Sequence, residues 1–472
     1  MRYFGPWFFL IVTAIIPVSN LVAEVTAAEP EFDNEVEFDL EFDPNKKVET
    51  PTHSVTDTNT DIIDIELDDS FINEGSTKTV RSAFRYTLDH EISLNPANHP
   101  ALINNRTGAQ VEFEKLITTN VYAKLDVIGN LYWSTDHVSK TAKKTVQTYG
   151  RIKEAWIQRS WQSVNLKVGK QIIVWSDVDS SRATDLINPS DNRELIFIDF
   201  EDARLGQWMI SASYFNNNVS WQGFINLLPE FNDLPPHDSI YNFTASLPPF
   251  PVIDAETPDP EAGIRAKIRL GAAELAILTA NLAPNQPAFE SVNEDFANQT
   301  IREKAVPFWL TGLNFNYASG KFLWKTDLAY KTNQQFNYLD SLPPGGLPLI
   351  AKDVVDVAVG VEYNQNQHSI DFSITRTIIK NWQESMFIER QTGLFLLNWR
   401  KPFLNEELSI VASYGRLYAQ SSQYVSFYAD YAYDDHLSLI GSLFLFDIAD
   451  TISIFSPLKD NDRLSLKIKY QF

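Results

Sequence analysis

The feature that most constrains the fold is an alternation of apolar and polar residues with period two, which recurs along the chain after about residue 79. Between Val355 and Tyr363, for example, every odd-numbered residue is apolar and the residues between them are polar or small. Successive side chains of a β-strand point to opposite faces, so this pattern is typical of strands with one apolar face. Turn-forming residues separate the segments, which predicts antiparallel hairpins.

Eighteen segments of this kind can be counted, and they are about 10–12 residues long, the length that a tilted strand needs to cross a bilayer. They lie near residues 79–91, 107–118, 119–134, 148–161, 162–175, 206–216, 217–227, 261–270, 271–282, 307–318, 320–331, 353–364, 367–379, 390–400, 406–418, 422–433, 436–447 and 461–472.

The connections between these segments alternate in length. Tight turns are predicted around Thr118-Thr119, Trp161, Asn217, Gly271, Ser319, Gln365, Asn405 and Asp434. The long connections are 176–205, 228–260, 283–306 and 332–352. Short turns at one end and long loops at the other are typical of outer-membrane barrels. We therefore predict an all-β fold, a transmembrane antiparallel outer-membrane β-barrel of about 18 strands over residues 79–472; the short connection near 419–421 leaves a count of 16 open.

The composition fits strands in lipid better than membrane helices. Aromatic residues make up 13% of the chain, yet the mean hydropathy is −0.21, so the rings stand among polar residues. Tyr, Trp and Phe gather at the ends of the segments, as an aromatic girdle requires. A soluble β-sandwich would also alternate, but the strand length, the aromatic ends and the sorted connections favour a membrane barrel.

The N-terminus resembles a secretory signal peptide. Arg2 precedes an apolar run at 7–16, Pro17 ends the run, and Ala28 is one of several small residues suited to cleavage. Ten apolar residues are too few to cross the bilayer as a helix. We predict a signal peptide at 1–28, with a short N-terminal anchor as the alternative.

An acidic segment follows the signal peptide. Residues 24–78 contain seventeen acidic residues against three lysines, which predicts a largely disordered periplasmic leader over 29–78. Apolar residues alternate with acidic ones at 36–42 and 63–67, and such a pattern can add a strand to the edge of another sheet. The alternatives are therefore a plug of the barrel or a docking segment for a periplasmic or inner-membrane transporter component.

The last strand carries the most specific signal. Its apolar positions alternate up to the final residue and are Leu464, Leu466, Ile468, Tyr470 and Phe472. A terminal strand of this kind resembles the insertion signal of bacterial outer-membrane proteins, so we expect the barrel-assembly machinery, outer-membrane lipid and lipopolysaccharide as partners. If Phe472 ends in the periplasm, every long loop lies outside the cell and the leader lies in the periplasm.

A barrel of eighteen strands encloses a lumen that its own side chains cannot fill. Polar residues occupy the predicted inner face of many strands, which favours a water-filled channel. The connection 176–205 is rich in Asp, Glu and Arg, and Arg is suited to bidentate pairing with carboxylates. This connection either folds into the lumen as a constriction or substrate site, or it is an extracellular loop stabilised by its own salt bridges.

Residues 151–209 resemble one known family. The run from Val168 to Trp175 is similar to its Gly-Arg/Lys-Gln-x-x-Val-Trp strand, and Asn188–Glu194 is similar to its Asn-Pro-x-Asp-x-Arg-Glu motif. Glu201–Arg204 is similar to its Glu-Asp-x-Arg motif. This is the proteobacterial outer-membrane family known as domain of unknown function 1302.

The resemblance implies a porin-like barrel that takes part in uptake or export of small or hydrophobic compounds, such as sterols, aromatics or lipids. It also indicates which residues of the charged connection to weigh as a constriction or substrate loop: Arg182, Asp185, Asn188, Asp191, Arg193, Glu194, Glu201, Asp202 and Arg204.

Several function classes do not fit the sequence. Cysteine is absent, which excludes disulfides and thiolate metal sites, and the formal charge of −22 would repel nucleic acid. Neither Gly-x-Ser-x-Gly nor His-Glu-x-x-His occurs, so we predict no enzyme, no metal and no cofactor. The alternative to a channel is a surface receptor or adhesin that uses the Pro-rich connections 228–260 and 339–349, or a plugged structural barrel.

Overall fold

The computed structural model describes residues 82–96, 101–136, 146–197, 202–236, 239–242, 252–291, 301–338, 348–386, 388–419, 421–449 and 455–472. The predicted signal peptide (1–28) and acidic leader (29–78) lie outside these residues, and both stay predictions. Within the described ranges, no helix combines the length and the apolar character that crossing a membrane requires.

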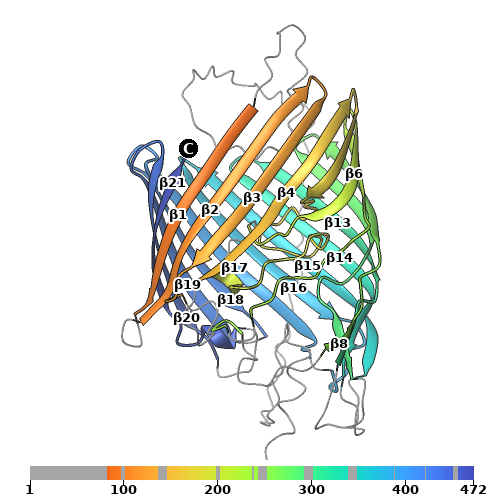
Figure 1. Cartoon of the computed structure of the whole chain (residues 1–472). Helices are drawn as coiled ribbons and strands as arrows, with labels where there is room; N and C mark the ends of the chain where they lie inside the picture. The colour runs from red at the N-terminus through yellow and green to blue at the C-terminus, as the bar shows by residue number, and fades with distance from the viewer. Residues whose placement is uncertain are drawn as a thin grey trace, which may run out of the picture. The chain divides into compact units, whose positions relative to one another are not determined.

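Eighteen of the described strands form one closed antiparallel barrel (Figure 1). Each barrel strand pairs with the next one along the chain, and β1 closes the ring by pairing with β21 over Thr87–Leu94. The barrel strands are β1 (Ser82–Asn95), β2 (Ala101–Thr118), β3 (Val121–Tyr132), β4 (Gln147–Trp161), β5 (Val164–Gln171), β6 (Gln207–Asn216), β7 (Val219–Asn226), β9 (Glu261–Leu270), β10 (Ala273–Leu282), β13 (Phe308–Ser319), β14 (Phe322–Asn337), β15 (Leu349–Gln365), β16 (His368–Ile379), β17 (Gln391–Phe403), β18 (Leu408–Leu417), β19 (Ser422–Ala432), β20 (Leu437–Asp447) and β21 (Arg463–Gln471).

Three further strands belong to the long connections. They are β8 (Val252–Ala255), β11 (Ala288–Ser291) and β12 (Ile301–Lys304), and they form a small sheet of their own. The sequence pattern does not predict them, because four residues are too few for a period of two to stand out.

The predicted sorting of the connections is confirmed. Tight turns join β2 to β3, β4 to β5 and the later hairpins, and several of their residues have positive φ, among them Asn217 (43°), Gly271 (64°) and Gly320 (61°). Glycine and asparagine adopt this backbone conformation at the lowest cost, which fixes each turn in place. Because β21 follows a long connection, Phe472 ends at the short-turn end of the barrel.

The predicted strands are confirmed, with differences at some ends. The alternative count of 16 is wrong, because β18 and β19 are separate paired strands. The predicted segment 162–175 is wrong at its end: β5 stops at Gln171. The alternation continues through Ile173 and Trp175, but their apolar side chains are buried inside the barrel and do not face lipid. The predicted connection 332–352 is shorter than expected, because β14 and β15 extend into it.

The residues of the predicted insertion signal share the outward face of β21. They are Leu464, Leu466, Ile468, Tyr470 and Phe472. All five are large hydrophobic side chains that no other part of the described chain buries. The ring of Phe472 stacks on Tyr86 of β1 with centroids 5.2 Å apart, and the backbones of the two residues exchange two hydrogen bonds. The last residue therefore helps to close the ring, whereas its recognition by the assembly machinery stays a prediction.

Candidate functional site

The candidate site is the connection between β5 and β6, residues 172–206, which we call the inward loop; 198–201 lie outside its described part. Asn188 holds its two ends together. The Oδ1 atom accepts a hydrogen bond from the N–H of Ile173 at 2.9 Å, and Nδ2 donates to the carbonyl of Leu205 at 2.8 Å. One buried amide thus satisfies backbone groups that lose their sheet partners where the chain leaves the wall.

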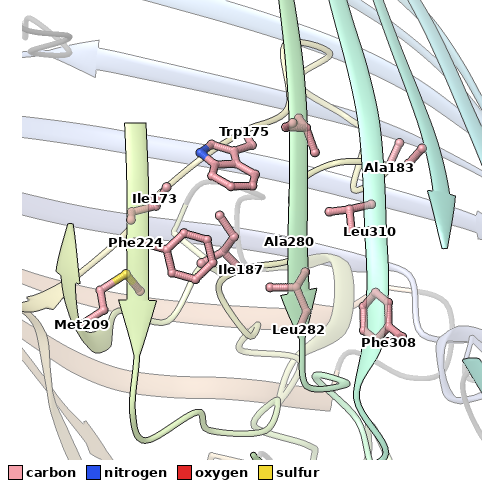
Figure 2. Packing of buried hydrophobic residues seen from close by; sticks show 12 residues of the cluster. Ile173, Trp175, Ala183, Ile187, Met209, Phe224, Ala280, Leu282, Phe308 and Leu310 are labelled. Carbon is pink, nitrogen blue, oxygen red and sulfur yellow. The ribbon is translucent and has the colours of Figure 1, made fainter. Parts of the chain in front are cut away.

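The underside of the inward loop is apolar and packs on the inner wall of the barrel (Figure 2). Trp175 is fully buried, its indole N–H donates to Oε1 of Gln222 at 2.8 Å, and its ring meets Phe224 edge-on at 5.4 Å. The cluster around it contains Ile173, Ala183, Ile187, Met209, Leu278, Ala280, Leu282, Phe308, Leu310 and Ala329. This part of the wall departs from the predicted polar lining, because its side chains face the inward loop and not water.

The first arm of the inward loop, residues 172–187, is held by a buried carboxylate on the wall. Asp327 of β14 accepts hydrogen bonds from Oγ of Ser176 at 2.5 Å and from two successive backbone N–H groups of the loop at 3.2 and 3.1 Å. Asn314 of β13 also donates to this carboxylate. A buried carboxylate without donors would be costly, so the loop and the wall depend on each other here.

Three more contacts tie the first arm to the wall. They join Asp177 to Arg265 of β9 at 3.1 Å, Asp179 to Lys325 of β14 at 2.8 Å, and Ser180 to Ser373 of β16 at 2.5 Å. The first pair is well shielded from solvent, whereas the carboxylate of Asp179 is largely exposed. The shielded pair therefore contributes more to holding the arm than the exposed one.

A buried ion pair joins the two arms of the inward loop. The Nε atom of Arg204 donates to Oδ2 of Asp185 at 2.8 Å, and both side chains are almost fully buried. Burial lowers the pKa of Arg182 beside this pair, and the charge of Asp185 opposes that shift. The guanidinium still carries its charge, because arginine does not lose its proton in proteins.

The second arm, residues 188–206, is organised around Asp191. Arg193 grips this carboxylate with Nε at 2.9 Å and Nη2 at 2.7 Å, and Arg151 of β4 approaches it at 3.2 Å. Burial alone would lower the pKa of Arg193, but the hydrogen bonds and charge of Asp191 raise it. The guanidinium also lies 3.5 Å from the centre of the Tyr149 ring, so a stacked and bidentate arginine fixes this arm.

Two further ion pairs fasten the second arm to the wall. Glu194 pairs with Arg106 of β2 at 2.5 Å, and the same guanidinium pairs with Asp136 at 3.1 Å. Asp202 pairs with Lys153 of β4 at 2.6 Å, at a position where its carboxylate is exposed. Arg106 is buried between two carboxylates, so removing it would leave uncompensated charge.

Aromatic contacts also join the second arm to β20 and β21. Phe197 meets Phe444 and Phe446 of β20 edge-on at 5.1 and 5.7 Å, and the guanidinium of Arg463 in β21 lies 3.5 Å from its ring centre. Arg463 donates to the hydroxyl of Tyr241, from the next long connection. Burial raises the pKa of Tyr241 to about 12, so this phenol stays neutral at physiological pH.

These contacts spread the inward loop along opposite sides of the lumen. Its arms reach β14 on one side and β2 on the other, and these two strands are half-way round the closed ring of eighteen from each other. The first arm reaches β16 and the second reaches β20 and β21. The strands between these last contacts are β17, β18 and β19.

The exposure of the inner side chains divides the wall into two parts. We call the lumen-facing residues of β10, β13 and β14 the covered wall, and those of β17, β18 and β19 the open wall. Leu278, Leu310 and Asp327 of the covered wall are at most 1% exposed. On the open wall Tyr428 is 38% exposed, Arg400 is exposed, and Leu394, Leu396, Asn398, Val411, Tyr424 and Asp430 are half-buried. The lumen is therefore occupied on one side and accessible on the other.

The structure brings most of the sequence-predicted loop residues into anchoring contacts. Asp185, Asn188, Asp191, Arg193, Glu194, Asp202 and Arg204 make the contacts given above, and Arg182 lies beside the Asp185–Arg204 pair. Glu201 lies outside the described residues. The wall partners Arg106, Arg151, Arg265 and Asp327 are not among the predicted site residues, because a strand residue shows its partner only once the barrel closes. For Arg106, Arg151 and Arg265, the lumen-facing position within an alternating strand is the sequence signal that points to them.

Within the described residues, no group of three or more His, Asp or Glu side chains could hold a metal ion. The family model described as "Protein of unknown function (DUF1302)" matches residues 56–472. No curated protein matches the chain.

Two solved outer-membrane proteins of Pseudomonas aeruginosa resemble the fold. OpdK, in its structure with vanillate, is 10% identical and superposes with a TM-score of 0.50 over 83% of this chain and 98% of that one. OccK8 (OprE) is 11% identical, with a TM-score of 0.50 over the same shares of the two chains. At this level of identity the likeness concerns the barrel fold.

Proposed function

Because the chain belongs to the DUF1302 family and has a porin-like barrel fold, we propose that it is an outer-membrane channel for small or hydrophobic solutes. The observation that carries this proposal is the asymmetry of the lumen. The inward loop crosses the barrel but leaves the side chains of the open wall accessible. Solutes pass between the inward loop and the open wall, and the loop sets the width of that passage.

The lining of the open wall supports a solute that has both an apolar part and a polar part. Leu394, Leu396 and Val411 offer aliphatic surface, and Tyr428 offers an aromatic ring with a hydroxyl group. Arg400 adds a guanidinium, which suits carboxylates and other planar anions. A purely apolar solute would leave these polar groups without partners, whereas an amphipathic one satisfies both kinds of surface.

The proposed orientation places the short turns and Phe472 in the periplasm and the long connections outside the cell. The chain is exported by the signal peptide at 1–28, and the acidic leader at 29–78 stays on the periplasmic side. There the leader either docks on a periplasmic or inner-membrane transporter component or plugs the barrel. Transport runs in the direction that such a component would set.

The proposal is tested by single-channel recording on protein purified from outer membranes, in planar bilayers with a KCl gradient. The wild type is compared with Asp327→Ala, which removes the carboxylate that holds the first arm. Its control is Asp371→Ala on β16, which removes one inward carboxylate that accepts a bond from Ser369 of its own strand. Heat-modifiable migration shows that each variant is folded.

We expect stable conductance steps from the wild type and larger, noisier steps from Asp327→Ala. Asp371→Ala should change the ion preference and leave the step size nearly unchanged. Folded, inserted wild-type protein that gives no current would overturn the channel and favour a plugged receptor. Equal conductance in both variants would show that the inward loop does not set the width of the passage.

A further inference from the structure

Two arginines on the lipid-facing side of the barrel, Arg376 and Arg416, lie on the nearby strands β16 and β18. Arg376 of β16 shares its face with Ile370 and Ile374, and all three side chains are exposed. Arg416 of β18 is likewise exposed and is paired in register with Phe395 of β17. Cations on the lipid face are costly at the bilayer midplane and cost little near the interfaces, so their height on the strands matters.

Both arginines lie near the end of the barrel that carries the long connections. Arg376 precedes the end of β16 at Ile379, and Arg416 precedes the last residue of β18 at Leu417. Strands β16 and β18 are separated only by β17, and the partners of the two arginines on β17, Gly393 and Phe395, are two residues apart. The two Cα atoms are therefore about 12 Å apart. In the proposed orientation this is the level of the head groups of the outer leaflet.

One small residue and one aromatic ring lie between the two arginines. Arg376 is paired in register with Gly393, which contributes no side chain to the row between β16 and β18. The ring of Tyr418, 52% exposed, lies over Gly393, with Cδ2 3.5 Å from the position that a Cβ would take. The surface between the arginines is therefore a tyrosine ring flanked by two cations.

The arginines have no acidic partner that would neutralise them. In the described part of the chain, neither Arg376 nor Arg416 forms an ion pair or a hydrogen bond through its side chain. Asp447 lies on the same row as Arg416, but Gln423 stands between them and donates to that carboxylate at 2.8 Å. Two uncompensated guanidinium groups at head-group level are complementary to phosphate.

An aromatic cluster lies on the midplane side of this patch. Phe395 meets Phe372 at 5.2 Å and Tyr414 at 5.8 Å, both edge-on, and all three rings are on the outward face. Cations above apolar rings are complementary to the two parts of an anionic lipid. The cations face its phosphate head group, and the rings face its acyl chains. We infer that Arg376 and Arg416 form a binding site for the phosphates of lipopolysaccharide, with its acyl chains over the Phe372, Phe395 and Tyr414 rings.

This inference rests on the proposed orientation and not on transport, so its test is independent of conductance. Native mass spectrometry on detergent-purified, delipidated protein measures the binding of diphosphoryl lipid A. The test variant is Arg376→Gln/Arg416→Gln. The control is Lys115→Gln/Arg159→Gln, which removes two exposed cations near the short-turn ends of β2 and β4. Heat-modifiable migration again verifies folding.

We expect the test variant to bind diphosphoryl lipid A at least about tenfold more weakly than the wild type, because each cation near an anionic surface contributes to binding. The control should bind like the wild type. The replacement Arg376→Lys/Arg416→Lys should restore part of the affinity, because it keeps the charge and loses the bidentate geometry.

Three outcomes would overturn the inference. Equal binding by the wild type and the test variant would show that the arginines do not hold the ligand. An equal loss of lipid A binding in the control variant would show that only the total charge of the protein matters. Phosphatidylglycerol that binds as tightly as lipid A, and is lost in the same variant, would assign the patch to ordinary phospholipids.

Discussion

The covered wall and the open wall are built from the same kind of strand, yet their lumen-facing side chains serve different purposes. Leu278, Leu310 and Ala329 of the covered wall pack against the inward loop like the core of a soluble protein. On the open wall, leucines and tyrosines of similar size remain accessible. A residue's chemistry therefore does not reveal its role in this lumen; what lies opposite the residue decides it.

Arginines inside the barrel also differ in role, according to whether the inward loop covers them. Arg106 and Arg265 are shielded and paired with carboxylates of the inward loop, so they hold structure. Arg400 is exposed on the open wall, so it can meet a solute. Changes on the covered wall should alter stability first, whereas changes on the open wall should alter ion preference first.

The largest effect is expected for Trp175→Ala, which breaks the apolar contact between loop and covered wall. Removing a buried tryptophan costs about 3–5 kcal/mol, and here it also leaves Gln222 without its indole donor. The inward loop should detach and become open to trypsin at Arg182 and Arg193, measured by mass spectrometry of the fragments.

The matched control for this variant is Trp221→Ala, which removes an outward-facing ring of β7 that is 45% exposed. It should leave the inward loop as resistant to trypsin as in the wild type. Resistance of Trp175→Ala at the wild-type level would contradict the view that this contact holds the loop.

A smaller effect is expected for Gly263→Ala. A Cβ at this position of β9 would lie 2.8 Å from Cη2 of Trp175 and 2.7 Å from Cβ of Ala280. Overpacking of this kind typically costs about 1–3 kcal/mol, so thermal unfolding should begin at a lower temperature. Far-UV circular dichroism at the β-sheet minimum, followed during heating, measures the shift in unfolding temperature.

Gly223→Ala is the corresponding control on β7. A Cβ there meets its nearest neighbour, the carbonyl oxygen of Gly263, at 3.5 Å, which is ordinary contact. Its unfolding temperature should match that of the wild type. If both glycine variants unfold alike, the tight fit of Trp175 against β9 is not what limits stability.

The smallest effect on stability is expected for Arg400→Gln. An exposed side chain contributes within about 0.5 kcal/mol, so unfolding should be unchanged. The reversal potential in a KCl gradient should shift toward cation preference, because a positive charge leaves the passage.

Arg265→Gln is the same substitution on the part of the wall that the loop occupies, and it should show the reverse pattern. It removes the partner of Asp177 and should destabilise the inward loop, with a smaller change in ion preference. Equal shifts of the reversal potential in both variants would show that an arginine under the inward loop and an arginine on the open wall affect ion preference alike.

Much of the barrel could be predicted from the sequence, because each strand carries its own signal. A period of two, a run of about ten residues and a turn residue with positive φ are local features, and they located every barrel strand. The strand ends were less predictable. The alternation runs on through Ile173 and Trp175, where the chain has already turned into the lumen.

The candidate site was predictable only in part. The charged run from Arg182 to Arg204 and the Asn-Pro turn at Asn188 stand out in the sequence, but their partners do not. Glu194 pairs with Arg106, and Asp177 pairs with Arg265. Long stretches of chain separate these partners, and only closure of the ring brings them together.

The sequence by itself determined that this chain forms a closed barrel with an apolar outer face, because alternation and turn chemistry are properties of neighbouring residues. Only the tertiary structure decided which part of the lumen is filled. That outcome depends on the packing of Trp175 and the donors around Asp327, which come from segments far apart in the chain. A strand pattern indicates which side chains point inward, and only the tertiary structure determines which residues they contact there.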